Sequence, residues 1–252
     1  MEQKENKCLM GMNGHSQKTV LAPDSRKGAN VRHAADLRRG ETLRPFPKPQ
    51  LAELMGATRD AGAAGFALAQ IPAGKPVLWV QDRMCAEEMG RPYGQGLERF
   101  GADRHKLIAV CASDAAGVLW AMEEGLKCSA LAAVIGEIWG DPAALDFTAT
   151  KRLAMRSERT GIQVFLIRFA AGSSLSAARS RWRVTSSISA PHPYDPQAPG
   201  VPRWRAELFR ARDSRPGLWE AGYDAKAHRL DLSSPLRDPA LEEPPLRYSR
   251  AG

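Results

Sequence analysis

The fold is decided by one short apolar stretch, Leu131-Ala-Ala-Val-Ile-Gly-Glu137, which ends in a single carboxylate. Helical patterns precede it, over 115–126, and follow it, over 147–160. An apolar run of this length between two helices is typical of a strand covered on both faces in a parallel sheet. In nucleotide-binding sheets the acid at the end of such a strand often binds magnesium. Glu137 is therefore a candidate metal ligand, provided that the chain also supplies a phosphate site.

Further strands are expected on either side of this stretch. Apolar runs over 77–80, 106–111 and 162–168 alternate with helical patterns, which predicts an α/β fold with a mostly parallel sheet flanked by helices. The pattern then changes. Apolar and polar residues alternate over 180–187 and over 203–223, as in strands, and 213–217 has the composition of a tight turn. We therefore expect a C-terminal β-hairpin extension.

The two ends of the chain have the composition of disordered segments. Residues 1–49 are rich in Lys, Arg, Asn, Gly and Ser, without sustained apolar periodicity, and 233–252 are charged and rich in proline. The sequence thus predicts a disordered basic tail over 1–49, one domain over 50–232 and a second disordered tail over 233–252.

Composition limits the class of protein. The 252 residues are enough for one α/β domain with tails, and 43% of them are hydrophobic. No apolar run reaches 18 residues, and the polar start is unlike a signal peptide, so we expect no membrane association. Four scattered cysteines without a CxxC pair indicate neither a zinc site nor disulfides. These features favour a cytoplasmic protein without a bound metal.

The net charge of +8 is unevenly spread. Residues 1–49 hold 10 Lys and Arg against 5 Asp and Glu, residues 50–149 hold 8 against 13, and residues 150–252 hold 18 against 10. A basic C-terminal half suggests contact with nucleic acid or with an acidic protein. A solvated, arginine-rich surface explains the same charge equally well.

A glycine-rich segment, Gly56-Ala-Thr-Arg-Asp-Ala-Gly62-Ala-Ala, resembles a phosphate-binding loop in spacing only. Such a loop needs a lysine and a hydroxyl after its last glycine, to hold the phosphates and magnesium. Ala63 and Ala64 take those places here. We therefore interpret Gly56, Gly62, Asp82 and Glu137 as a vestigial nucleotide site, with no ATPase activity, no cofactor and no catalytic residue.

A cluster of arginines lies in a stretch without acidic residues, 159–194. Strand alternation places Trp182 on the face opposite Arg181 and Arg183, so Trp182 is expected in the core and the arginines on a basic face. The same pattern recurs around Trp204. Single-stranded DNA, a protein partner and plain solvent all remain open as neighbours of this face. The candidate binding residues are Arg168, Arg179, Arg181, Arg183, Arg203 and Arg205.

Several stretches, taken in order, resemble the inducible-mutagenesis A (ImuA) proteins, degenerate relatives of RecA that accompany a damage-induced mutagenic polymerase system. They are Leu119-Trp-Ala-Met-Glu-Glu-Gly-Leu126, Leu131-Ala-Ala-Val-Ile-Gly-Glu-Ile138, Leu145-Asp-Phe-Thr-Ala-Thr-Lys-Arg-Leu153, Ala177-Ala-Arg-Ser-Arg-Trp-Arg-Val184 and Gly217-Leu-Trp-Glu220. The resemblance runs from about residue 51 to 232. It implies a RecA-like fold in which Asp82 matches the catalytic acid, Glu137 the metal-associated acid and Gly62 the start of the Gly-Lys-Thr.

The resemblance also implies a function. A protein of this kind is a non-catalytic accessory factor of the SOS response to DNA damage. It supports error-prone translesion DNA synthesis and contacts the RecA recombinase and a companion Y-family-like polymerase subunit. Two alternatives remain open from the sequence. One is a RecA-like ATPase with a divergent phosphate loop, and the other is an SOS-type inhibitor of cell division.

Overall fold

The computed structural model describes residues 48–172 and 174–233. The predicted tails fall outside these ranges, apart from residues 48, 49 and 233. The strands within them are β1 (Leu51–Gly56), β2 (Val77–Asp82), β3 (Leu107–Ala112), β4 (Ala133–Trp139), β5 (Gln163–Phe169), β6 (Ser180–Ser187), β7 (Arg203–Ala211), β8 (Gly217–Asp224) and β9 (Arg229–Ser233). The helices are α1 (Gly62–Leu68), α2 (Arg83–Glu88), α3 (Gly94–Glu98), α4 (Ala115–Gly125) and α5 (Phe147–Thr160), with a 3-10 turn at Arg104–Lys106.

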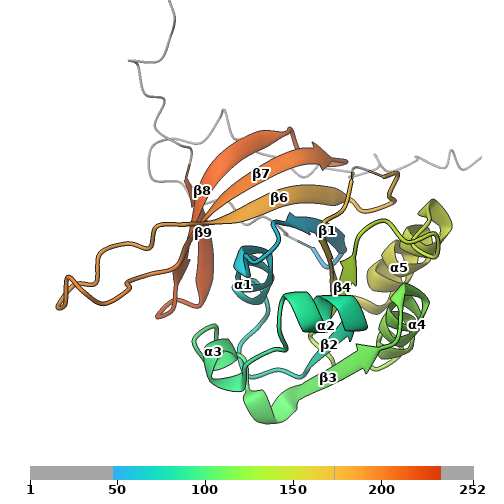
Figure 1. Ribbon diagram of the computed structural model, residues 1–252, viewed down its shortest axis with the longest axis horizontal. Helices are drawn as coiled ribbons and strands as arrows, with labels where there is room; N and C mark the ends of the chain where they lie inside the picture. Colours follow the sequence, from blue (N-terminus) through green and yellow to red (C-terminus); the bar gives the residue numbers. More distant parts are fainter. Residues whose placement is uncertain (1–47, 173, 234–252) are drawn as a thin grey trace, which may run out of the picture. The chain divides into compact units, whose positions relative to one another are not determined.

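The strands form one nine-stranded sheet in the order β3-β2-β4-β5-β1-β6-β7-β8-β9. Every neighbouring pair from β3 to β6 is parallel, and the pairs from β6 to β9 are antiparallel. In Figure 1 the orange and red strands β6 to β8 continue the sheet beyond the blue strand β1. This arrangement confirms the predicted α/β fold, with its mostly parallel sheet and C-terminal antiparallel extension.

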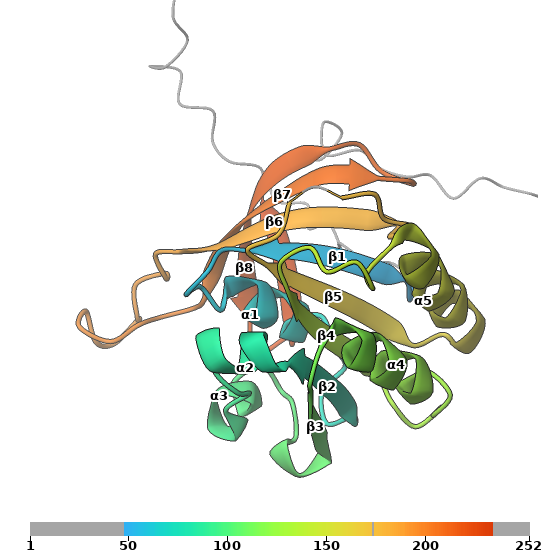
Figure 2. The ribbon, with the colours of Figure 1, turned by 45° about the vertical axis from the view of Figure 1, so that its right-hand side comes forward.

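Two apolar cores lie on the two faces of the sheet. One contains residues of α1, α2 and α3 together with the inner face of the extension, and its largest members include Phe66, Trp182 and Trp219. The other lies between the sheet and helices α4 and α5. Figure 2 shows α4 and α5 side by side along one face, with α1, α2 and α3 gathered apart from them. Helices cover both faces only over the parallel part of the sheet.

The stretch 131–137 forms most of β4, between β2 and β5, and residues 133–138 of the strand are buried. The strand begins at Ala133 and continues to Trp139, so Glu137 lies inside the strand and does not end it, contrary to the prediction. Gly136 is required for the packing of α4, because a Cβ there would lie 2.1 Å from the sulfur of Met122.

Helix ends follow local chemistry. Asp114 accepts a hydrogen bond from the amide of Gly117 (2.9 Å) and caps α4, and Asp146 caps α5 through Ala149 (2.7 Å). Gly161 ends α5 in the left-handed conformation (φ +72°). The sequence predicted helices close to these bounds.

Helix α2 and strand β9 were not predicted. Helix α2 directly follows β2, and the side chain of Asp82 caps its first turn. Strand β9 extends the predicted hairpin of β7 and β8 by one more strand. In the described part of the chain, no helix has the length and apolarity that crossing a bilayer requires.

Candidate functional site

The predicted vestigial nucleotide site lies at the carboxyl ends of the parallel strands. Gly56 ends β1, Gly62 begins α1, Asp82 ends β2 and Glu137 lies near the end of β4. A pocket of about 440 Å³ opens here, and its lining includes Gly62 and Glu137. The rest of the lining is mainly apolar and aromatic and includes Trp79, Tyr93, Phe100, Phe169 and Trp204. The fold thus brings residues far apart in sequence to one end of the sheet.

The loop between β1 and α1 is closed by its own carboxylate, Asp60. Its oxygens accept hydrogen bonds from the amides of Gly62 (2.8 Å) and Ser186 (2.8 Å) and from the Ser186 hydroxyl (2.5 Å). Burial disfavours the charged carboxylate, but these hydrogen bonds outweigh it and lower the pKa of Asp60. The first amide of α1 is therefore already bonded to a negative charge of the chain itself.

A phosphate does not fit this loop. A bound phosphate would have to displace Asp60 or lie beside its negative charge, and Ala63 and Ala64 offer neither a lysine nor a hydroxyl. Gly62 is also packed tightly, because a Cβ there would lie 2.8 Å from the Ser186 nitrogen. The residues of this loop do not suit a nucleoside triphosphate with its magnesium ion.

Asp82 is a buried structural residue. Its Oδ1 accepts a hydrogen bond from the amide of Cys85 (2.7 Å), which caps α2, and its Oδ2 accepts one from the amide of Trp139 (2.8 Å). Both oxygens are thus bonded to backbone groups, and the side chain ties the end of β2 to the end of β4.

Glu137 is also buried, and Gln81 Nε2 donates to its Oε2 over 2.7 Å. Burial raises the pKa of Glu137 from 4.5 to about 7, and the nearby charge of Asp82 adds to the rise, while the hydrogen bond from Gln81 opposes it. Burial therefore favours the neutral form of this carboxyl more than in an exposed glutamate. Within 48–172 and 174–233, no three His, Cys, Asp or Glu residues group as metal ligands would.

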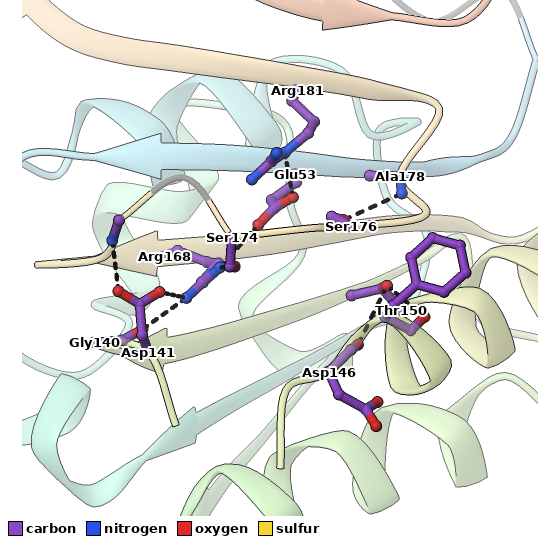
Figure 3. Close-up of polar contacts among 12 residues, drawn as sticks. Glu53, Gly140, Asp141, Asp146, Thr150, Arg168, Ser174, Ser176, Ala178 and Arg181 are labelled. Atoms are coloured by element: carbon purple, nitrogen blue, oxygen red, sulfur yellow. Dashed lines mark hydrogen bonds and ion pairs between the residues drawn. The ribbon is translucent and has the colours of Figure 1, made fainter. Parts of the chain in front are cut away.

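Two of the six candidate arginines are buried in an ion cluster around Glu53. Arg168 NH1 lies 3.2 Å from Glu53 Oε1, and Arg181 Nε lies 2.7 Å from Glu53 Oε2. All three side chains are at most 2% exposed. Arg168 also bonds Ser174 (2.8 Å), the carbonyl of Gly140 (2.8 Å) and Asp141, as Figure 3 shows.

Arg168 and Arg181 consequently lie on no exposed basic face, contrary to the prediction. Alternation assigned Arg181 to the correct side of β6, since Trp182 is buried on the other side. The missing information was Glu53, which lies on the neighbouring strand β1 and pairs with both arginines. A lone acid inside an apolar strand, Leu51-Ala-Glu-Leu54, was the available signal.

The four other candidate arginines are at least partly exposed. Arg179 bridges Glu158 (2.6 Å) and Asp213 (3.3 Å), which joins α5 to the turn after β7. On the outer face of the extension Arg183 pairs with Glu207 (3.1 Å) and Arg203 with Glu220 (3.3 Å). Arg205 has no acidic partner within 48–172 and 174–233. This face is therefore mixed in charge, and its binding role stays a prediction.

Comparison with known proteins gives a clear relative. The chain is 35% identical over 190 residues to the protein named ImuA of Caulobacter vibrioides, in strains NA1000 / CB15N and ATCC 19089 / CIP 103742 / CB 15. The aligned region covers 69% of this chain and 73% of that protein. No family model matches the chain.

Proposed function

The chain belongs to the ImuA family, and we propose that it is a non-catalytic accessory protein of damage-induced mutagenesis. In this proposal it acts in the cytoplasm during the SOS response and supports error-prone translesion DNA synthesis. It does so by contacting the RecA recombinase and a companion Y-family-like polymerase subunit. The RecA-like ancestry of the fold belongs to the same proposal.

One observation carries the non-catalytic part of the proposal: the loop before α1 is filled by the Asp60 carboxylate. A phosphate-binding loop works because its free amides and a lysine attract an anion. Here an amide is already bonded to a carboxylate and the lysine is absent. Asp82 and Glu137 keep places that a catalytic site would use, yet both oxygens of Asp82 accept hydrogen bonds from backbone amides, and burial raises the pKa of Glu137.

Nucleotide binding is tested by the melting temperature of the full chain with and without millimolar ATP and magnesium. We expect no shift, and the same result for Glu137→Ala. A rise of several degrees in the wild type that Glu137→Ala removes would overturn the non-catalytic proposal. It would favour the RecA-like ATPase with a divergent loop, whose ligand would occupy the 440 Å³ pocket.

The partner proposal is tested by co-purification from DNA-damaged cells. The tagged chain should retain RecA and the polymerase subunit after damage, and a tagged unrelated protein of similar charge should retain neither. Recovery of a cell-division protein in their place would contradict the proposal.

A further inference from the structure

Strand β3 forms one end of the sheet and pairs only with β2 among the described strands. Its sequence, Leu107-Ile-Ala-Val-Cys-Ala112, has no charge and no proline. Its pairing with β2 is regular, and the side chain of Ile108 is 51% exposed. Such an edge offers unpaired backbone groups to another strand.

The other end of the sheet is protected in a way that β3 is not. Strand β9 carries Arg229 and Asp231, which pair with each other across 2.5 Å. Charges on an edge strand discourage the pairing of further strands. The two edges of one sheet therefore differ, and only β3 is suited to accept another strand.

Charges lie just outside the two ends of β3, and they have opposite signs. Asp103, Arg104, His105 and Lys106 precede the strand and carry a net positive charge, with Arg104 paired to Glu98 (3.3 Å), and Asp114 follows the strand. Asp114 uses Oδ1 to cap α4, while its Oδ2 has no partner within 48–172 and 174–233. The Lys106 ammonium lies 3.4 Å from Asp103 and 3.0 Å from the carbonyl of Gly74, in the loop before β2, so a new contact with an acid such as Asp114 of a second copy would have to compete with these two. A strand that pairs here should be acidic where β3 begins and basic where it ends.

A second β3 in antiparallel orientation meets this requirement. We propose that two copies of the chain dock edge to edge through β3, about a two-fold axis at Val110. Ile108 then lies opposite Ala112 of the partner subunit, and Lys106 lies opposite Asp114 of the partner subunit. A parallel arrangement would instead place like charges together. The two sheets join into one continuous sheet across the axis.

The dimer formed in this way is weak. One pair of short strands buries less than the roughly 1,200 Å² at which standard interfaces begin. The contact also depends on exposed charges, which salt screens over about 8–10 Å. We therefore expect association at micromolar concentrations and dissociation at high salt.

Two of the three cysteines within 48–172 and 174–233 are exposed and make the test direct, because Cys111 lies on β3 and Cys128 lies in the loop after α4. Alkylation of the full chain is followed by peptide mass mapping at 1 to 100 µM protein, together with sedimentation velocity. Cys111 should react several-fold more slowly at the high end of this range, in step with dimer formation. Cys128 should react at a constant rate and serves as the internal control.

Ile108→Glu tests the surface itself, because the new carboxylate faces Asp114 of the partner subunit diagonally. It should abolish the dimer and restore fast alkylation of Cys111. Met155→Glu, an equal change at an exposed residue of α5 (61% exposed), should dimerise as the wild type does. Circular dichroism verifies that both variants fold.

Three results would overturn the proposal. The first is a monomer throughout the concentration range. The second is protection of Cys111 that does not depend on concentration, which would mean that another part of the same chain covers β3. The third is a dimer that Ile108→Glu leaves intact, which would place the interface on another surface.

Discussion

Replacing Glu137 by glutamine should stabilise the protein at alkaline pH and leave it nearly unchanged in acid. The folded protein raises the pKa of this carboxyl from 4.5 to about 7, mainly because the side chain is buried. Between these two values the folded state binds more protons than the unfolded state, so the stability of the wild type falls as the pH rises. The difference corresponds to about 3 kcal/mol of unfolding free energy.

The sign follows from the direction of the pKa change. Below pH 4.5 the carboxyl is neutral in both states, and its contribution to stability is fully present. As the pH rises through 7, the folded state must bury a charge, and the contribution is lost. Glutamine stays neutral throughout and can still accept the hydrogen bond from Gln81. Glu137→Gln should therefore gain stability over the wild type as the pH rises from 4 to 8, by about 3 kcal/mol in total.

Urea unfolding at pH 4, 5, 6, 7 and 8, followed by tryptophan fluorescence, measures this difference. An exposed glutamate of α2 provides the control. The unfolding free energy of Glu88→Gln should differ from that of the wild type by the same amount at every pH. Parallel curves for Glu137→Gln and the wild type would refute the reasoning. They would mean that Glu137 is charged in the folded protein at neutral pH, and its use as a metal ligand would have to be reconsidered.

Three further predictions concern the other charged groups. Glu53→Gln leaves a buried arginine without its counter-charge and should lower the free energy of unfolding by about 3–5 kcal/mol, a fall of roughly 6–20 °C in the melting temperature. Glu207→Gln breaks an exposed pair and should lower the free energy of unfolding by at most about 1 kcal/mol. Asp60→Ala removes three hydrogen bonds to a carboxylate and should lower the free energy of unfolding, measured with urea at pH 7, by about 2 kcal/mol. Because the fold lowers the pKa of Asp60, the wild type should keep this stabilisation until the pH falls below 3.8. If the outer face binds single-stranded DNA, the double variant Arg203→Ala/Arg205→Ala should bind it with a weaker dependence on salt. In fluorescence anisotropy the slope of log K against log salt concentration should be smaller in magnitude by about 0.7 for each phosphate that the variant no longer neutralises. An unchanged affinity would exclude this face as the DNA-binding site.

Local patterns predicted the parts of the fold that depend on neighbouring residues. The apolar run of β4, the helices that follow residues 114 and 146 and the burial of Trp182 all follow from patterns within a few residues. Helix α2 was missed because its cap, Asp82, was interpreted as a vestigial catalytic acid.

The candidate sites were harder to predict, because their contacts join distant parts of the chain. Asp60 and Ser186 are separated by 126 positions, and Glu53 and Arg168 by 115. Alternation assigns a side chain to a face of the sheet, but it does not say what covers that face. For Arg181 the decisive fact was an acid on the adjacent strand, which only the strand order reveals.

The ion cluster reduces the number of positive charges in the C-terminal half that are free to bind a partner. Arg168 and Arg181 neutralise Glu53 inside the protein, and Arg179, Arg183 and Arg203 each pair with an acid on another element. An arginine that already has a carboxylate partner releases less free energy on meeting a phosphate, because one attraction replaces another. Net charge therefore overstates the affinity of this half for DNA. We therefore propose a protein partner for this surface, because complementary charges on a face of mixed sign provide specificity more than raw affinity.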